Sequence, residues 1–221
     1  MPFPGGIESL SNGTLLFSAV AAFFYLLMQA RAPSWRRTAM KAGSIGLLAL
    51  LVAIEGGPFL LVAALVLSAI GDAFLAQEDD RAFLAGLASF LAAHIVYVTL
   101  FLLAGGGVEI LMAQPWRVGL PLIAVAAAIP LTVRLLPAVG SSLRLPVTAY
   151  VTAILAMMLA AATVSAPLVM VGAALFLASD AILAAERFLV LPDSTHRAWT
   201  GPAVWVIYYL AQLSIALGFI L

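Results

Sequence analysis

Residues 68–82 read SAIGDAFLAQEDDRA, and residues 176–190 read FLASDAILAAERFLV. Each stretch places an aspartate six residues before a glutamate inside an apolar run, and five of the eight positions that begin at Gly71 are identical when the stretches are aligned at an offset of 108 residues. The matched acidic residues are Asp72 with Asp180 and Glu78 with Glu186. We expect a chain made of two similar halves, each with an aspartate at the same place.

The composition is that of an integral membrane protein. Of the 221 residues, 65% are hydrophobic and only 9% are charged, and the mean hydropathy is +1.17. A helix crosses the hydrocarbon layer in about 20 apolar residues, so the chain has room for at most about eight crossings and for no separate soluble domain. The formal net charge of zero argues against a nucleic-acid partner.

The sequence offers few metal ligands. It has no cysteine, and its two histidines are His94 and His196. Cysteine-based and three-histidine zinc sites are therefore excluded. The chain also lacks a P-loop, a dinucleotide-binding glycine motif and an H-E-x-x-H motif. We expect neither a metal nor a cofactor.

Apolar runs broken by glycine, proline and charge predict an all-α bundle of eight transmembrane helices, which forms a single domain over residues 1–221. The predicted spans are about 14–30, 42–54, 58–78, 82–104, 118–136, 145–163, 168–190 and 202–221. The second is the shortest and reaches the usual length only with Lys41 and Glu55 as snorkelling ends. Residues 105–107, all glycine, are expected to form a loop. The repeat would make the first four spans parallel to the last four.

The positive charges predict the orientation. With the loop RAPSWRRTAMK in the cytoplasm, nine of the ten Lys and Arg residues lie inside and Arg117 lies outside. The protein would lie in the cell (inner) membrane, and both termini would face the periplasm or cell exterior. The first apolar run is expected to be a retained helix, because no Lys or Arg precedes it. Lys41 would stand at the cytoplasmic entrance of the second span, where it binds anionic membrane lipid or the phosphate of a substrate.

Asp72 and Asp180 are the candidate catalytic residues. A carboxylate in hydrocarbon costs about 2.5–3.5 kcal/mol on insertion scales, so an aspartate inside a membrane usually has polar surroundings and a function. In parallel repeats both aspartates lie at one depth, about 9 Å below the glutamates at the cytoplasmic ends. The alternative is that each only bonds neighbouring helices or water.

Further polar residues are candidates for binding or supporting a substrate. These candidates are Lys41, His94, Tyr97, Tyr150, Glu186, Tyr208 and Gln212. Gly86, Phe90, His94 and Tyr97 recur at helical spacing along one face of the fourth span. The alternative roles are an interhelical hydrogen bond for His94 and interfacial anchoring for the tyrosines. Gln212 is a buried amide that needs partners.

Together these motifs resemble the lysoplasmalogenases, also called YhhN-like proteins, an eight-span membrane family. The matching pieces are Lys41, Gly71-Asp72, the run Gly86-x-x-x-Phe90-x-x-x-His94-x-x-Tyr97, Ala149-Tyr150, Ser179-Asp180 and YYLAQ at 208–212. One departure is Ala42, where the family usually has proline after the lysine. The resemblance implies hydrolysis of the vinyl ether bond of a lysophospholipid, which releases a fatty aldehyde and a glycerophospho-head group.

The two aspartates suit this chemistry. Vinyl ethers are protonated at carbon, and water captures the resulting oxocarbenium ion, so the reaction needs an acid and a nearby negative charge, as in glycosidases. We hypothesise that one aspartate donates the proton while the other stabilises the cation and activates water. Ser179 is expected to hydrogen-bond Asp180, which favours Asp72 as the acid. The site would open to the cytoplasmic leaflet, with the lipid phosphate near Lys41.

Other functions remain open at this point. A proton-coupled transporter also uses parallel repeats with acidic residues, although neither the third nor the seventh span has a proline or a paired-glycine break. A lipid-binding or structural membrane protein is a third possibility. Within the enzymes, a metal-dependent site would need His94 beside carboxylates.

Overall fold

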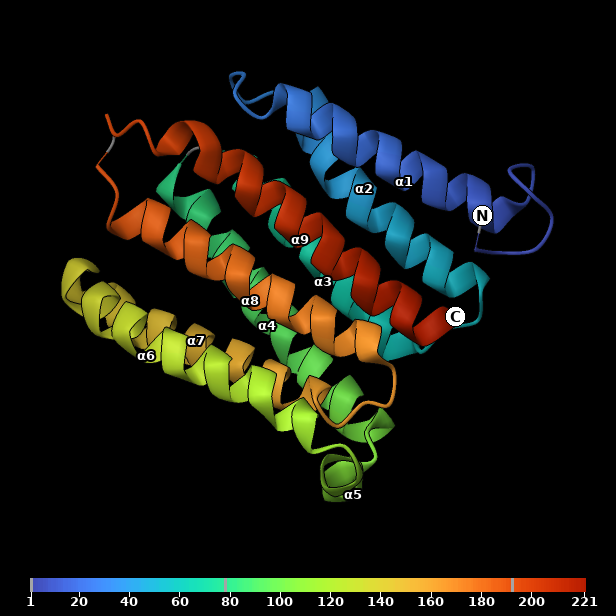
Figure 1. Cartoon of the computed structure of the whole chain (residues 1–221). Helices are drawn as coiled ribbons and strands as arrows, with labels where there is room; N and C mark the ends of the chain where they lie inside the picture. Colours follow the sequence, from blue (N-terminus) through green and yellow to red (C-terminus); the bar gives the residue numbers. More distant parts are fainter. Residues whose placement is uncertain (1, 78, 192) are drawn as a thin grey trace. The chain divides into compact units, whose positions relative to one another are not determined.

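The computed structural model describes residues 2–77, 79–191 and 193–221, and these residues form helices without any strand. The helices, labelled in Figure 1 where there is room, are α1 (Leu10–Met28), α2 (Trp35–Ile54), α3 (Phe59–Leu75), α4 (Asp80–Ala104), α5 (Gly107–Ala113), η1 (Pro115–Val118), α6 (Gly119–Ala138), α7 (Ser141–Ala161), α8 (Pro167–Phe188) and α9 (Arg197–Ile220). Each predicted span overlaps one of the helices α1–α4 and α6–α9, and the all-α prediction is confirmed. Glu78, part of the predicted repeat, lies outside the described residues.

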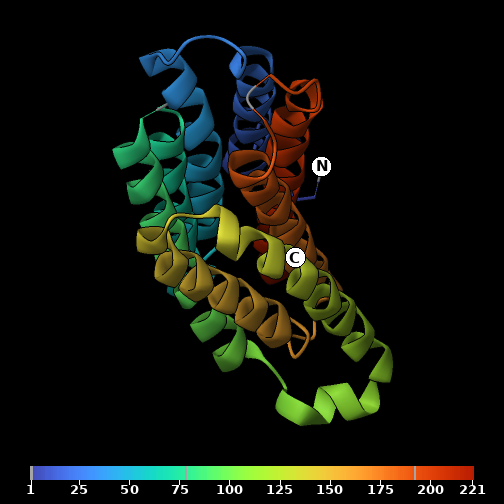
Figure 2. The ribbon, with the colours of Figure 1, turned by 90° about the vertical axis from the view of Figure 1, so that its left-hand side faces the viewer.

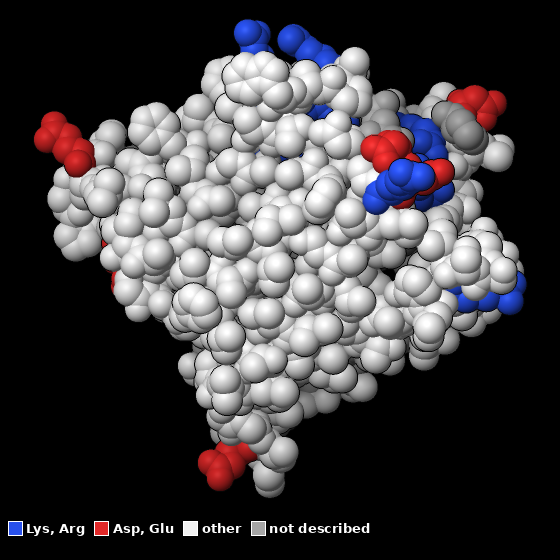
Figure 3. Space-filling view, turned by 180° about the vertical axis from the view of Figure 1, so that it is seen from behind, with Lys and Arg blue, Asp and Glu red and all other residues white. Residues whose placement is uncertain are grey.

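The helices have the properties of membrane spans. Seven are long and apolar enough to cross a bilayer, and α3, with 17 residues, is shorter. Most of the surface visible in Figure 3 belongs to uncharged residues, and large apolar side chains such as Phe17 and Leu103 are exposed on the helices. Helices that satisfy their own backbone and expose such side chains are suited to lipid. The chain is a multi-pass integral membrane protein.

The predicted bounds of the second span and of the glycine loop were wrong. The second span was placed at about 42–54, but α2 begins at Trp35 and has 20 residues. Ser34 caps it by accepting a hydrogen bond from the backbone N–H of Arg37 at 3.3 Å, and the long basic side chains of its first turns can lie along the helix while their charges reach the interface. The predicted glycine loop ends in α5, which with η1 forms a short helical connection between α4 and α6 (Figure 2).

The described residues fall into two compact units. Unit 1 comprises Met1–Tyr97 and Ala216–Leu221, and unit 2 comprises Val98–Ile215. Both α4 and α9 contribute residues to each unit. Whether the chain is one domain, as predicted, stays a prediction.

In unit 1, α1 packs on α2 and α2 packs on α3, as Figure 1 shows for the first pair. The Ser18 hydroxyl donates to the backbone oxygen of Ser44 at 2.7 Å, which ties α1 to α2. Two glycines let α3 and α4 approach closely. A Cβ on Gly71 would lie 2.7 Å from the Phe90 ring, and one on Gly86 would lie 2.8 Å from Leu75. The helix contact therefore requires the glycine that precedes Asp72.

In unit 2, α6, α7 and α8 pack against one another. Gly172 brings α8 close to α9, because a Cβ there would lie 2.7 Å from the backbone oxygen of Ala211. Arg117 is 1% exposed and donates to the backbone oxygens of Val164 and Ser165, each at 2.6 Å. These carbonyls follow the end of α7, so the arginine closes the C-terminal end of that helix.

Candidate active site

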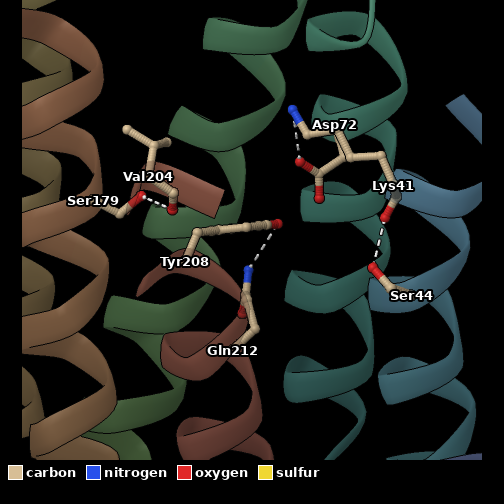
Figure 4. A network of polar contacts seen from close by, with 7 residues as sticks. All are labelled: Lys41, Ser44, Asp72, Ser179, Val204, Tyr208 and Gln212. Carbon is tan, nitrogen blue, oxygen red and sulfur yellow. Dashed lines mark hydrogen bonds and ion pairs between the residues drawn. The ribbon is translucent and has the colours of Figure 1, made fainter. Parts of the chain in front are cut away.

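Unit 1 contains a buried ion pair between two of the predicted residues. Nζ of Lys41, on α2, lies 3.4 Å from Oδ1 of Asp72, on α3 (Figure 4). The lysine side chain is 11% exposed and the aspartate side chain 2%. Charges inside apolar helices are costly unless they are paired. An aspartate inside an apolar helix was expected to have polar surroundings, and Lys41 provides them for Asp72.

The consecutive helices α2 and α3 bring these residues together, because Lys41 lies near the start of α2 and Asp72 near the end of α3. Lys41 lies about 9 Å along α2 from its first residue, and Asp72 lies about 5 Å from the last residue of α3. The Ser44 hydroxyl donates to the backbone oxygen of Lys41 at 2.8 Å (Figure 4). On α1, the Tyr25 ring centroid lies 5.5 Å from Nζ of Lys41. Three helices of unit 1 thus contribute to the surroundings of one ammonium group.

Helix α4 places its predicted face in the interior. His94 and Tyr97 are fully buried, and Phe90 covers Gly71 on α3. Nδ1 of His94 lies 2.7 Å from the backbone oxygen of Phe90. A carbonyl oxygen can only accept, so Nδ1 donates in this contact. This hydrogen bond of His94 is made within α4.

Unit 2 contains the second aspartate and a different partner. The Tyr150 hydroxyl, on α7, donates to Oδ2 of Asp180, on α8, at 2.6 Å. A hydrogen bond this short, between a phenol and a carboxyl group, is typical of a strong contact. Tyr150 therefore belongs to the surroundings of Asp180.

Ser179 does not make the predicted bond in the described structure. Its hydroxyl donates to the backbone oxygen of Val204, on α9, at 3.0 Å (Figure 4). Adjacent residues of a helix lie about 100° apart around its axis, so Ser179 and Asp180 face different directions. The Ser179 hydroxyl points from α8 to α9. Ser179 therefore gives no reason for Asp180 to be the ionised member of the pair, and the expected preference for Asp72 as the acid is not supported.

Tyr208 and Gln212 are joined on α9. Nε2 of Gln212 donates to the Tyr208 hydroxyl oxygen at 3.3 Å (Figure 4), and both side chains are buried. The Tyr208 ring meets Phe176 edge-on with centroids 5.3 Å apart. The tyrosine is therefore part of the interior of unit 2, and the amide has one of the partners that it needs.

Glu186 lies in the last turn of α8, apart from the Tyr150–Asp180 contact. Its backbone oxygen accepts a hydrogen bond from Nη2 of Arg197 at 3.0 Å. Its Oε2 is buried, and no hydrogen-bond partner for this atom occurs among the described residues. No described bond connects Glu186 to the other candidates.

The two aspartate contacts follow one pattern. Asp180 follows Asp72 by 180 − 72 = 108 residues, and Tyr150 follows Lys41 by 150 − 41 = 109 residues. Each aspartate, on α3 or α8, contacts a partner on the helix that precedes it, α2 or α7. The two contacts differ chemically, because one partner is a cation and the other a neutral phenol.

Sequence reasoning missed Tyr25 and Arg117. Tyr25 lies in the aromatic run Phe23-Phe24-Tyr25, and composition does not show which of the three rings faces inward. Lys41, by contrast, was among the candidates. That it is the only lysine in the chain also marks it as a residue with a special role. Among the described residues, no group of three His, Asp or Glu side chains is placed to hold a metal ion.

Comparisons with known proteins agree with the motifs. The sequence pattern described as the YhhN family matches residues 36–219. The pig protein named lysoplasmalogenase TMEM86B is 34% identical over 207 residues, which are 91% of this chain and 83% of the pig protein. No solved structure matches the chain.

Two further relatives align over shorter regions. The Mycobacterium tuberculosis protein named lysoplasmalogenase is 34% identical over 165 residues, 72% of this chain and 59% of that protein. The human protein named lysoplasmalogenase TMEM86A is 36% identical over 93 residues, 38% of this chain and 39% of that protein. The chain thus spans less than two thirds of these two relatives.

Proposed function

The chain belongs to the YhhN family, and from this membership we propose that it is a membrane-embedded hydrolase that cleaves the vinyl ether bond of lysoplasmalogens. The substrate is a lysophospholipid, and the products are a fatty aldehyde and a glycerophospho-head group. The identity to a pig lysoplasmalogenase over 91% of this chain is the observation that supports the reaction most directly. The buried Lys41–Asp72 pair supports the location of the chemistry within the helices.

The reaction consumes one water molecule. A carboxylic acid protonates the vinyl carbon that is not bonded to oxygen, and the neighbouring carbon becomes part of an oxocarbenium ion. Water adds to that carbon and gives its proton to a carboxylate. The hydroxyl of the resulting hemiacetal loses its proton and becomes the aldehyde carbonyl, while the bond to the glycerol oxygen breaks and that oxygen takes up a proton and leaves as an alcohol.

We assign the proton donor to Asp180 and the water-activating carboxylate to Asp72. Lys41 supplies a positive charge that a negatively charged Asp72 balances. Asp180 has a neutral partner in Tyr150, whose hydroxyl is bonded to Oδ2. This division of roles follows the chemical difference between the two contacts.

The remaining candidates support the lipid. An ammonium group has three N–H donors, so Lys41 can contact Asp72 and a lipid phosphate together. His94, Tyr97, Tyr208 and Gln212 are buried polar groups that we place along the path of the substrate or its water. Glu186, at the end of α8, is the weakest member of the set, because no described bond links it to the others.

The finer topology belongs to the same proposal. We propose that α3 is the eighth crossing, since its 17 residues span about 26 Å, close to the thickness of the hydrocarbon layer. The first four and last four crossings would be parallel repeats, supported by the matching spacings of the two aspartates and of their partners. Both termini would lie outside the inner membrane, and the site would open to the cytoplasmic leaflet, following the positive charges.

Substitution of both aspartates tests the proposed chemistry. Purified Asp72→Asn and Asp180→Asn proteins, recovered at wild-type yield, should each release aldehyde from a vinyl ether lysolipid at least about 100-fold more slowly than the wild-type protein. Transport of the intact lipid into vesicles without aldehyde would support a carrier instead. Wild-type rates in both variants would refute the assignment.

A further inference from the structure

Helix α1 contributes to the Lys41–Asp72 pair although it lies before the region that the family pattern matches. That region begins at residue 36, whereas α1 ends at Met28. The contribution is the ring of Tyr25, whose centroid lies 5.5 Å from Nζ of Lys41. The three aromatic residues of this run differ in exposure: Phe23 and Phe24 are 58% and 49% exposed, and Tyr25 is 6% exposed. Only the last of the three faces the interior.

We propose that Tyr25 is a positioning residue that holds the ammonium group of Lys41 beside Asp72, an inference that rests on the proposed function. The face of an aromatic ring carries negative potential and attracts a cation within about 6 Å of its centroid. The attraction is strongest where water is excluded, and both side chains are largely buried here.

The ring adds to the described contact between Lys41 and Asp72. The 3.4 Å between Nζ and Oδ1 exceeds the usual 2.7–3.2 Å of an N–H···O hydrogen bond. A lysine has a flexible four-carbon side chain and acts as a point charge, so one contact at this distance does not fix its direction. The attraction of the Tyr25 ring, whose centroid lies 5.5 Å from Nζ, further restricts where the ammonium group lies.

A chain of hydrogen bonds sets the register of α1 against this site. The Ser18 hydroxyl donates to the backbone oxygen of Ser44, and the Ser44 hydroxyl donates to the backbone oxygen of Lys41. Ser18 and Tyr25 are seven residues apart, about two helical turns, so they share one face of α1. The bond at Ser18 thereby places the Tyr25 ring over the lysine.

Graded fluorination of the ring tests the proposal without changing its shape. Fluorine withdraws electron density from the ring face, so phenylalanine at position 25 is compared with increasingly fluorinated phenylalanines at the same position. We expect the rate of aldehyde release to fall stepwise, about tenfold in total, and Tyr25→Phe to keep most of the wild-type rate. The same series at the exposed Phe24 should be flat. A flat series at position 25 would overturn the proposal.

A second measurement does not depend on activity. Because Lys41 is the only lysine, protein labelled with ¹³C-lysine gives a single set of side-chain NMR signals. Its methylene protons next to Nζ should show the upfield ring-current shift of an aromatic face, kept in Tyr25→Phe, lost in Tyr25→Leu and unchanged in Phe24→Leu. An identical spectrum of Tyr25→Leu would overturn the contact.

A final comparison separates positioning from a structural effect. In a Lys41→Met background the fluorine series should no longer change the residual rate, because the ring acts through the lysine. A series that stays equally steep in this background would show that the ring acts elsewhere. If the wild-type protein releases no aldehyde, the proposed function fails, whereas the NMR comparison still decides whether Tyr25 holds Lys41.

Discussion

Nζ of Lys41 and Oδ1 of Asp72 lie 3.4 Å apart in the interior of unit 1, where they join α2 to α3. The pair consists of the only lysine in the chain and one of the two aspartates that interrupt apolar spans. Such a pair is stable only while both members are present, because either charge alone would remain in an apolar environment. The contribution of the pair to the stability of the protein can therefore be measured separately from its catalytic role.

Lys41→Met should lower the free energy of unfolding by about 3–5 kcal/mol, because it leaves the Asp72 carboxylate without its cation. Replacing both members, as Lys41→Met with Asp72→Leu, should restore most of this stability but no activity. Thermal or denaturant unfolding in detergent, followed by circular dichroism, measures both changes. The exposed Arg36 provides a control, since Arg36→Met should change the stability by less than about 0.5 kcal/mol. A Lys41→Met protein as stable as the wild type would contradict a stabilising ion pair.

Tyr150→Phe should reduce kcat about tenfold, since it removes the hydroxyl that orients the Asp180 carboxyl group at 2.6 Å. The lost volume is one oxygen atom, so the protein should remain folded. Steady-state aldehyde release measures the effect. Thr148→Val, on the same helix at an exposed position, should leave kcat unchanged. Equal rates for the two variants would remove Tyr150 from the site.

Gly71→Ala should destabilise the protein by about 1–3 kcal/mol and slow the reaction, because the added Cβ would lie 2.7 Å from the Phe90 ring and push α3 and α4 apart beside Asp72. Gly46→Ala is the matched control, since nothing lies within 4 Å of a Cβ there. It should be neutral or slightly stabilising, because alanine favours a helix. Unfolding of the two variants under the same conditions gives the comparison. If Gly71→Ala is as stable as Gly46→Ala, the close helix contact is wrong.

Arg117→Lys should destabilise the protein by about 2 kcal/mol or more, although it keeps the positive charge. The guanidinium group donates to the backbone oxygens of Val164 and Ser165 at the same time, and the ammonium group of lysine cannot reproduce this fork geometry. The KM of the protein that remains folded should not change, because the arginine acts at the end of α7. The exposed Arg134 is the control, and Arg134→Lys should have no effect. Equal unfolding midpoints for Arg117→Lys and Arg134→Lys would show that the fork is not required.

The sequence predicted the helices well because a membrane-spanning helix needs a run of consecutive apolar residues, which can be seen in the sequence without knowledge of the packing. The second span was underestimated because hydropathy treats Arg36, Arg37 and Lys41 as interruptions, whereas their long side chains are compatible with a helix that continues from Trp35. The sequence also made both aspartates candidates, since charge inside an apolar run is conspicuous without any knowledge of packing.

The partners of those aspartates were harder to predict. Whether Ser179 bonds Asp180 or the backbone of Val204 depends on how α8 is rotated against α9, which is set by packing at residues such as Gly172. The same applies to Tyr25, whose neighbours have similar side chains but face outward. Tyr150 and Lys41 were both named as candidates, but their pairing with particular aspartates follows only from the arrangement of the helices.

Hydrolysis of a vinyl ether lysolipid in D₂O tests the central claim most directly, with the aldehyde reduced to an alcohol as it forms so that it cannot exchange hydrogen. Protonation at carbon predicts one deuterium at carbon 2 of the product, and the saturated alkyl ether lysolipid should remain uncleaved. A product without deuterium, or equal cleavage of the saturated lipid, would contradict acid catalysis by the aspartates.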